Sequence, residues 1–291
     1  MKKKIISVIA GVAGLTMAYF LASGISHIIY NHPAESTPAE SETQSTVQGT
    51  EEAKSAMTED EINEMLAGMK TTETSETETA TEEQSEVIPV KFEELQAVNP
   101  DIYAWITVPG TDIDYPILQH ASDNTYYLMH NIDGSYGYPG CIYTENMNSK
   151  DFTDNNTVIY GHNMKNGSMF AQLHKFEDPD FFNENREVLI YLPDEVLHYT
   201  IFAAHIYNDR HLLYSFDFTD PEVYQKYLDS IFSTRDMSAN IDKDITVTTD
   251  DQIITLVTCI GSQPNNRLLV QAVLTDREPG AETARAAAAT E

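Results

Sequence analysis

The chain reads Ile253-Ile254-Thr255-Leu256-Val257-Thr258-Cys259 near its C-terminal end, followed by a polar stretch, 260–266, and then by Arg267-Leu268-Leu269-Val270. Short runs this rich in β-branched and apolar residues are typical of buried strands. The stretch between them contains Gly, Pro and Asn, which indicates a loop. If the two strands pair in antiparallel fashion, Arg267 returns alongside Cys259.

The same pattern recurs through the rest of the C-terminal two thirds of the chain and predicts an all-β core, built as a barrel or a sandwich. Turn signals such as Pro109-Gly110 and Pro139-Gly140 separate the runs. A helix is predicted from Asp220 to 232, with Pro221 in its first turn, and a shorter one over 168–176. The predicted strands are 102–108, 113–118, 141–144, 157–160, 188–192, 197–207, 245–247, 253–259 and 268–274.

The N-terminal residues predict a membrane anchor. Residues 1–4 contain three lysines, and residues 5–30 are apolar and almost uncharged, which is long enough to span a bilayer. The lysines place the N-terminus in the cytoplasm and the remainder of the chain outside the cell. A cleaved signal peptide is the alternative, because Ala22-Ser23-Gly24 is a small-residue site, but the apolar run continues past it. We therefore expect a single-pass anchor in the cell membrane.

Residues 31–88 predict a disordered acidic linker, with one amphipathic patch near 59–69 that we expect to be transiently helical. The segment is rich in Glu, Ser and Thr and poor in large apolar residues, so it cannot build a core. About half of the net charge of −29 lies in it. No basic stripe occurs that could neutralise phosphates, which excludes nucleic-acid binding. The folded domain is predicted over 89–277, followed by a disordered tail, 278–291.

Three residues far apart in the sequence form a candidate catalytic set. Cys259 ends a predicted strand, and a thiol attacks only as thiolate, so it needs a base or a cation nearby. His162 follows a strand directly, after Gly161, which would let the backbone turn there. Arg267 can donate several hydrogen bonds to an oxyanion. The alternatives are a disulfide between Cys259 and Cys141, the only other cysteine, and a solvated surface arginine.

A metal site is not predicted. His198, His205 and His211 lie near each other in the sequence, but no His-Glu-x-x-His or paired-cysteine spacing accompanies them. We expect these to be ordinary strand and loop histidines.

The segment ending in Cys259 resembles the Thr-Leu-x-Thr-Cys motif of sortases, and Arg267 follows at a spacing that sortases use. The histidine block, Asn156 to Met164 with Gly167-Ser168-Met169-Phe170, resembles that of class B sortases. Similar stretches occur at 105–116 and 123–128, so the resemblance covers about 99–275. The helix near 220–232 also fits, because class B members carry an added helix before the cysteine strand.

The resemblance implies a mainly β fold, the closed eight-stranded sortase barrel with short helices and the added helix at 220–232. It implies that Cys259, His162 and Arg267 meet at one end of a groove, with Asn124 and Tyr160 near bound peptide. Asn124 and Tyr160 also have a structural reading, in a turn and at a strand end. Class B sortases frequently have serine where this chain has Val257. The valine cannot make the polar contact that serine would make with the substrate backbone, so the peptide preference is expected to differ.

The implied activity is that of a cysteine transpeptidase without a cofactor. It would cleave the sorting signal of an exported protein after threonine and transfer the acyl group to an amine of a peptidoglycan precursor or a pilin. The resemblance leaves open the recognised pentapeptide and whether single proteins are anchored or pilus subunits joined. Two other classes stay open: another cysteine acyl-transferase or peptidase of the cell wall, and a non-catalytic surface binding domain.

Overall fold

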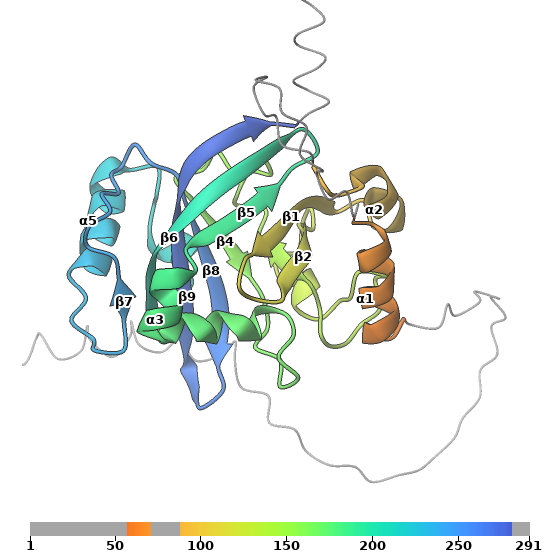
Figure 1. The fold of residues 1–291 in the computed structure, drawn as a ribbon, viewed down its shortest axis with the longest axis horizontal. Coiled ribbons are helices and arrows are strands. Elements are labelled where there is room, and N and C mark those ends of the chain that lie inside the picture. The colour runs from red at the N-terminus through yellow and green to blue at the C-terminus, as the bar shows by residue number, and fades with distance from the viewer. Residues whose placement is uncertain (1–56, 71–87, 281–291) are drawn as a thin grey trace, which may run out of the picture. The chain divides into compact units, whose positions relative to one another are not determined.

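The computed structural model describes residues 57–70 and 88–280. Its strands and helices follow one another along the chain as Figure 1 shows. The strands are β1 (Ile102–Val108), β2 (Ile113–Leu118), β3 (Ile142–Thr144), β4 (Asn156–Tyr160), β5 (Glu187–Tyr191), β6 (Glu195–Asn208), β7 (Asn240–Ile241), β8 (Ile253–Ile260) and β9 (Gln263–Pro279). The helices are α1 (Glu59–Gly68), α2 (Phe92–Val98), η1 (Tyr126–Leu128), η2 (Phe170–Glu177), α3 (Pro179–Glu184), α4 (Leu212–Ser215) and α5 (Pro221–Phe232).

The strands form one sheet that closes on itself. Neighbours run in the order β5-β1-β2-β3-β4-β8-β9-β6-β7, and an additional pairing between β5 and β6 closes eight of the nine strands into a barrel. β7 pairs only with β6 and stays outside the ring. The pairs β2–β3 and β4–β8 are parallel, and the others are antiparallel. The prediction of a mainly β, closed eight-stranded barrel is confirmed.

Apolar side chains on both faces of the strands hold the barrel and its helices together, because burying them removes apolar surface from water. One cluster of buried side chains includes Ile106, Ile190 and Val270. α5 begins at Asp220, whose carboxylate caps the amides of Glu222 and Val223. Its Tyr224, Tyr227, Leu228 and Ile231 are buried in a second cluster that includes Phe202 of β6 and Val273 of β9. The predicted added helix is therefore present.

Part of the predicted linker is instead an ordered helix. The N-terminus of α1 is stabilised by a capping box, in which the side chains of Thr58 and Glu61 each accept a hydrogen bond from the other's backbone amide. Its Leu66 is buried in a cluster with Trp105 and Cys141, and Lys70 forms an ion pair with Asp114. The assignment of 31–88 as disordered is thus wrong over 57–70. The apolar patch is short, but its contacts with the barrel offset the loss of chain entropy.

Three other boundaries differ from the prediction. Residues 245–247 are not a strand, and their Val247 is buried in an irregular segment against the α5 cluster. β9 begins at Gln263 and continues to Pro279, so most of the predicted loop 260–266 and the start of the predicted tail are strand. The helix expected over 168–176 is the 3-10 helix η2.

The expected anchor, 5–30, lies outside the described residues, as do the rest of the linker and residues 281–291. Over 57–70 and 88–280, no helix combines the length and the apolar character that crossing a bilayer requires.

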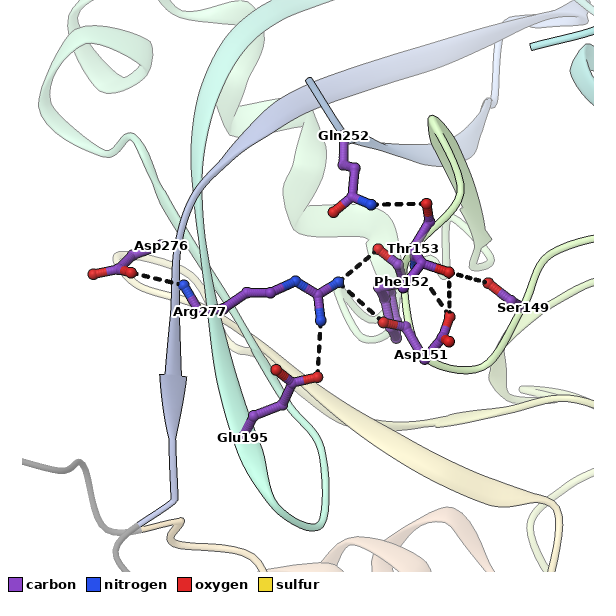
Figure 2. Close-up of polar contacts among 8 residues, drawn as sticks. All are labelled: Ser149, Asp151, Phe152, Thr153, Glu195, Gln252, Asp276 and Arg277. Atoms are coloured by element: carbon purple, nitrogen blue, oxygen red, sulfur yellow. Dashed lines mark hydrogen bonds and ion pairs between the residues drawn. The ribbon is translucent and has the colours of Figure 1, made fainter. Parts of the chain in front are cut away.

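The C-terminal end of β9 is fixed to the loop before β4 by Arg277 (Figure 2). Its guanidinium lies 2.8 Å from the Glu195 carboxylate and donates to the carbonyl oxygens of Asp151 and Phe152 at 3.1 and 2.9 Å. Phe152 is fully buried with φ of 55°, a backbone conformation that side chains other than glycine rarely adopt. Arg277 therefore holds an unfavourable turn in place.

Candidate active site

The cysteine and the arginine lie opposite each other on two neighbouring strands. In the antiparallel pair β8–β9, Cys259 is the partner of Arg267. Side chains at directly opposed positions emerge on the same face of a sheet. Residues 261 and 262 form a tight turn that the pair Ile260–Gln263 closes, and the register shifts between this pair and the pair Cys259–Arg267.

The histidine arrives from β4, which runs parallel to β8. Tyr160 pairs with Val257, and the next residue, Gly161, donates its amide to the Val257 carbonyl at 3.1 Å. The Thr258 hydroxyl donates to the Gly161 carbonyl at 2.9 Å. The β4–β8 pairing ends at Tyr160 and Val257, so His162 and Cys259 each follow the last pair by two residues.

Gly161 is needed for space rather than for a turn. Its φ is not positive, and a Cβ built on it would lie 2.5 Å from Ile142 and 2.6 Å from the Phe170 ring. Any side chain there would push β4 away from the core, and His162 with it. The prediction that this glycine lets the backbone turn is therefore wrong.

The ring of His162 is oriented by its surroundings. Nε2 lies 2.7 Å from the Leu128 carbonyl oxygen, which can only accept, so Nε2 carries the proton. The Tyr138 ring stands edge-on to the imidazole, with centroids 5.1 Å apart. In the neutral ring Nδ1 is then the nitrogen with a lone pair, and it is the one able to exchange a proton with a reactant.

Gly140 permits this orientation. Its φ is +68°, and a Cβ there would lie 2.7 Å from the Tyr127 carbonyl oxygen and 2.9 Å from that of Leu128. The loop before β3 can therefore approach the carbonyl that bonds His162 only because residue 140 has no side chain.

Arg267 keeps most of its guanidinium available. One nitrogen, Nη1, donates to the carbonyl oxygens of Pro264 and Asn266, each at 2.9 Å. Within 57–70 and 88–280, no carboxylate forms an ion pair with it. The side chain is half-buried. Such a guanidinium can receive a negative charge that develops on a ligand.

The two cysteines differ in their exposure to solvent. Cys259 is exposed and Cys141 is buried, and both are free thiols, so the disulfide alternative is wrong. Burial, and then the charge of Asp133, raises the pKa of the Cys141 thiol far above its ordinary value. Cys141 is held as a neutral thiol 3.4 Å from the His130 carbonyl oxygen, and Cys259 is the one that solvent reaches.

Asn124 and Tyr160 both lie near the segment that follows β3, Asn124 at Asn146 and Tyr160 at Glu145. The Asn124 side-chain oxygen accepts from the Asn146 amide at 2.9 Å. Tyr160 is half-buried and stacks on Tyr143, with ring centroids 5.3 Å apart. Burial, and then the Glu145 charge, raises the pKa of the Tyr160 hydroxyl, which stays protonated and able to donate. Both residues thus have structural contacts, and Tyr160 also ends the strand that leads to His162.

The three histidines near 198–211 have separate environments. His205 is buried and bonds Gln271, and burial lowers the pKa of its imidazole. His211 lies 2.7 Å from the Glu145 carboxylate, and His198 lies 3.7 Å from that of Glu187. No metal-binding cluster of His, Cys, Asp or Glu occurs among the residues that the structure describes.

Several residues around His162 and Cys259 carry no signal in the sequence that would predict their contacts. Leu128 acts through a backbone carbonyl, which no side-chain pattern reveals. Asn163 and His174 both bond the Cys259 carbonyl oxygen, at 2.9 and 3.1 Å. Asn163 belongs to the block 156–164 that carries the family resemblance, whereas His174 is part of a helix with no chemical signal of its own.

Comparisons with known proteins show which family this chain resembles. A family model described as the sortase domain matches residues 106–275. Sortase B of Listeria monocytogenes is 36% identical over 171 residues, which span 58% of this chain and 67% of that relative.

Solved structures show the same fold. Sortase B of Clostridium perfringens is 34% identical with a TM-score of 0.58, and the match covers 64% of this chain and 100% of that one. A Staphylococcus aureus sortase B–substrate complex is 27% identical with a TM-score of 0.56, covering 64% of this chain and 84% of that one.

Proposed function

Because this chain belongs to the sortase family of cysteine transpeptidases, in its class B, we propose that Cys259 is its nucleophile, His162 its general acid and base, and Arg267 the group that stabilises the oxyanion. The observation that carries this assignment is the register. β8 places Cys259 opposite Arg267 on β9 and next to the β4 end that bears His162. This pairing supports a site assembled from distant parts of the sequence around an exposed thiol.

In the first step, the Cys259 thiolate attacks the carbonyl carbon that follows threonine in a peptide sorting signal. A carbon–sulfur bond forms, and the carbonyl oxygen takes the negative charge, which the Arg267 guanidinium neutralises. The carbon–nitrogen bond then breaks, and His162 gives a proton to the departing amine. The product is a thioester on Cys259.

In the second step, an amine attacks the thioester. His162 removes a proton from the incoming nitrogen, the carbon–sulfur bond breaks, and the thiolate returns as an amide forms. No oxidant or reductant is needed, because no atom changes its oxidation state in either step. We propose a peptidoglycan precursor or a pilin as the source of the amine, and an exported protein with a C-terminal sorting signal as the acyl donor. The Staphylococcus aureus neighbour is a complex of sortase B with a substrate.

Two further assignments belong to this proposal. Asn124 and Tyr160 contact the bound peptide, Tyr160 from its place at the end of β4. The chain is held in the cell membrane by residues 5–30, with its barrel outside the cell. Such an anchor would keep the enzyme at the surface where both substrates occur.

The test is cleavage of a library of quenched fluorescent pentapeptides by the purified full-length chain, with and without an added amine. We expect cleavage after threonine, an amine-linked product in the mass spectrum, and loss of both in Cys259→Ala. Cys141→Ala is the matched control, because it removes the buried thiol and leaves the exposed one. Cleavage that survives Cys259→Ala would contradict the proposal.

A further inference from the structure

Two side chains from different elements converge on the backbone carbonyl of Cys259. Asn163 Nδ2 donates to the Cys259 oxygen at 2.9 Å, and His174 Nε2 lies 3.1 Å from the same oxygen. Asn163 Nδ2 and His174 Nε2 are 3.0 Å apart. Three polar groups thus meet at the nucleophile's main chain, on the side where η2 packs.

Glu177 fixes the orientation of the imidazole. Its carboxylate oxygen lies 2.8 Å from His174 Nδ1 and can only accept, so Nδ1 carries a proton. In the neutral ring Nε2 then accepts from the second Asn163 hydrogen. In the imidazolium form Nε2 donates directly to the Cys259 oxygen. Both forms leave the Asn163 amide bonded to that oxygen, so Asn163 is the constant member of the cluster.

The hydrogen bond from Asn163 to the Cys259 carbonyl matters because Asn163 directly follows His162 in the chain. This bond therefore ties the main chain of the proposed acid–base residue to that of the proposed nucleophile. The residues linked are 96 apart in sequence. Further back, the Thr258 hydroxyl bonds the Gly161 carbonyl. The two strand ends are therefore connected on each side of the reacting pair.

We propose that Asn163 is a positioning residue for the transpeptidation, and that His174, oriented by Glu177, holds it in place. The inference rests on the proposed roles of Cys259 and His162. A small displacement of reacting groups lowers the rate of the chemical step without weakening substrate binding. Because the cluster acts through the main chain of Cys259, we expect its effect to fall on kcat.

The experiment measures kcat, KM and the thermal midpoint of the full-length chain with the peptide that it cleaves best. Asn163→Asp keeps the shape but sets an oxygen against the Cys259 carbonyl oxygen, and we expect kcat to fall about 10- to 100-fold at unchanged KM. His174→Ala should lower kcat about 3- to 10-fold, and His174→Gln, which keeps a polar group there, should recover part of it. Gln172→Ala is the matched control, because Gln172 lies on η2 but bonds Asp112.

Two measurements separate positioning from a general structural role. Glu177→Ala should lower kcat in the parent chain but have no further effect in His174→Ala, since Glu177 acts only through that ring. Alkylation of Cys259 by iodoacetamide needs no peptide, and it should proceed in every variant. A kcat of Asn163→Asp equal to that of the parent, or a KM that rises as kcat falls, would overturn the inference. Failure of the parent chain to cleave any peptide while Cys259 is still alkylated would instead count against the proposed function.

Discussion

Arg267 and Arg277 lie on the same strand, β9, and are used in opposite ways. Arg277 has a carboxylate partner, Glu195, and donates to two carbonyl oxygens of a strained turn. Arg267 bonds only carbonyl oxygens of its own hairpin and has no carboxylate partner in 57–70 or 88–280. Ten residues of strand separate them, about 30 Å.

The difference separates a guanidinium that contributes to folding from one that, under the proposed mechanism, receives the charge of a ligand. A paired, half-buried arginine stabilises the fold, because removing it leaves its partners unsatisfied. An arginine without a carboxylate contributes little to the fold and keeps its donors for a charge that arrives with the substrate. Arg186, which lies 2.6 Å from Asp242, belongs to the first kind.

The largest effect is expected from Arg267→Ala. If this arginine stabilises the oxyanion, kcat/KM should fall about 10²- to 10³-fold, as for the loss of an oxyanion donor elsewhere. The thermal midpoint should stay within a degree or two, because the side chain has no carboxylate to leave unpaired. Steady-state cleavage of the fluorescent peptide and a thermal melt check both. A large loss of stability would remove the contrast with Arg277.

The converse is expected from Arg277→Ala. It leaves Glu195 and the two carbonyl oxygens without their donor, and we expect a loss of about 2 kcal/mol in the free energy of unfolding. For a domain of this size that lowers the thermal midpoint by about 4–8 °C. Peptide cleavage at 25 °C should be unchanged. If activity fell along with stability, the two ends of β9 would not be independent.

Gly140→Ala tests whether a residue near the site can affect both activity and stability. Gly140 lies near His162 but has a structural role, so both kcat and the free energy of unfolding should fall. The positive φ costs about 1–2 kcal/mol with a side chain present. The Leu128 carbonyl must also shift and reorient His162, so kcat should fall about 10-fold. Gly167→Ala, with φ of +86° and no atom within 4 Å of its Cβ, is the control for backbone strain alone. Equal kcat values in the two variants would show that the Leu128 contact is unimportant.

The smallest effect concerns Asp242. The Arg186 guanidinium that bonds it lowers the pKa of its carboxyl below the ordinary value. A lowered pKa contributes stability above the unfolded value, near pH 4, and that stability is lost as the pH falls through the folded value. Asp242→Asn should therefore destabilise the chain by about 0.5–1 kcal/mol at pH 7 and by progressively less below pH 4. Denaturant unfolding at several pH values measures this. A difference that stays constant down to pH 2 would contradict it.

The strands of the barrel could be predicted well because each strand is recognised from its own short run of residues. β1 and β2 have the predicted bounds, since each is a run of apolar and β-branched residues between turns. The pairing of Cys259 with Arg267 also followed from two adjacent strands joined by a short connection. The amphipathic patch near 59–69 was expected to be only transiently helical, because the contacts with the barrel that order α1 cannot be read from the local sequence.

The surroundings of the site could not be predicted for the same physical reason. The Leu128 carbonyl reaches His162, and His174 reaches Cys259, through pairings across the tertiary structure. Every residue has a backbone carbonyl, so the sequence cannot show which one bonds His162. The chain has nine histidines, and nothing in the sequence around His174 identifies the residue that it contacts. The role given to Gly161 was wrong for a related reason, because the Phe170 ring that fills the space beside it is visible only in the fold.

The parallel pairing of β4 with β8 has a consequence for how the enzyme is made. The hydroxyl of Thr258 meets the Gly161 carbonyl across 97 residues of chain. Contacts of such wide sequence separation form late, because the entropy of closing a long loop must be overcome first. A nascent chain that already carries His162 still lacks β8, the strand that bears Cys259. The Cys259 thiol therefore reaches its proposed partner His162 only after β8 has been made and has paired with β4.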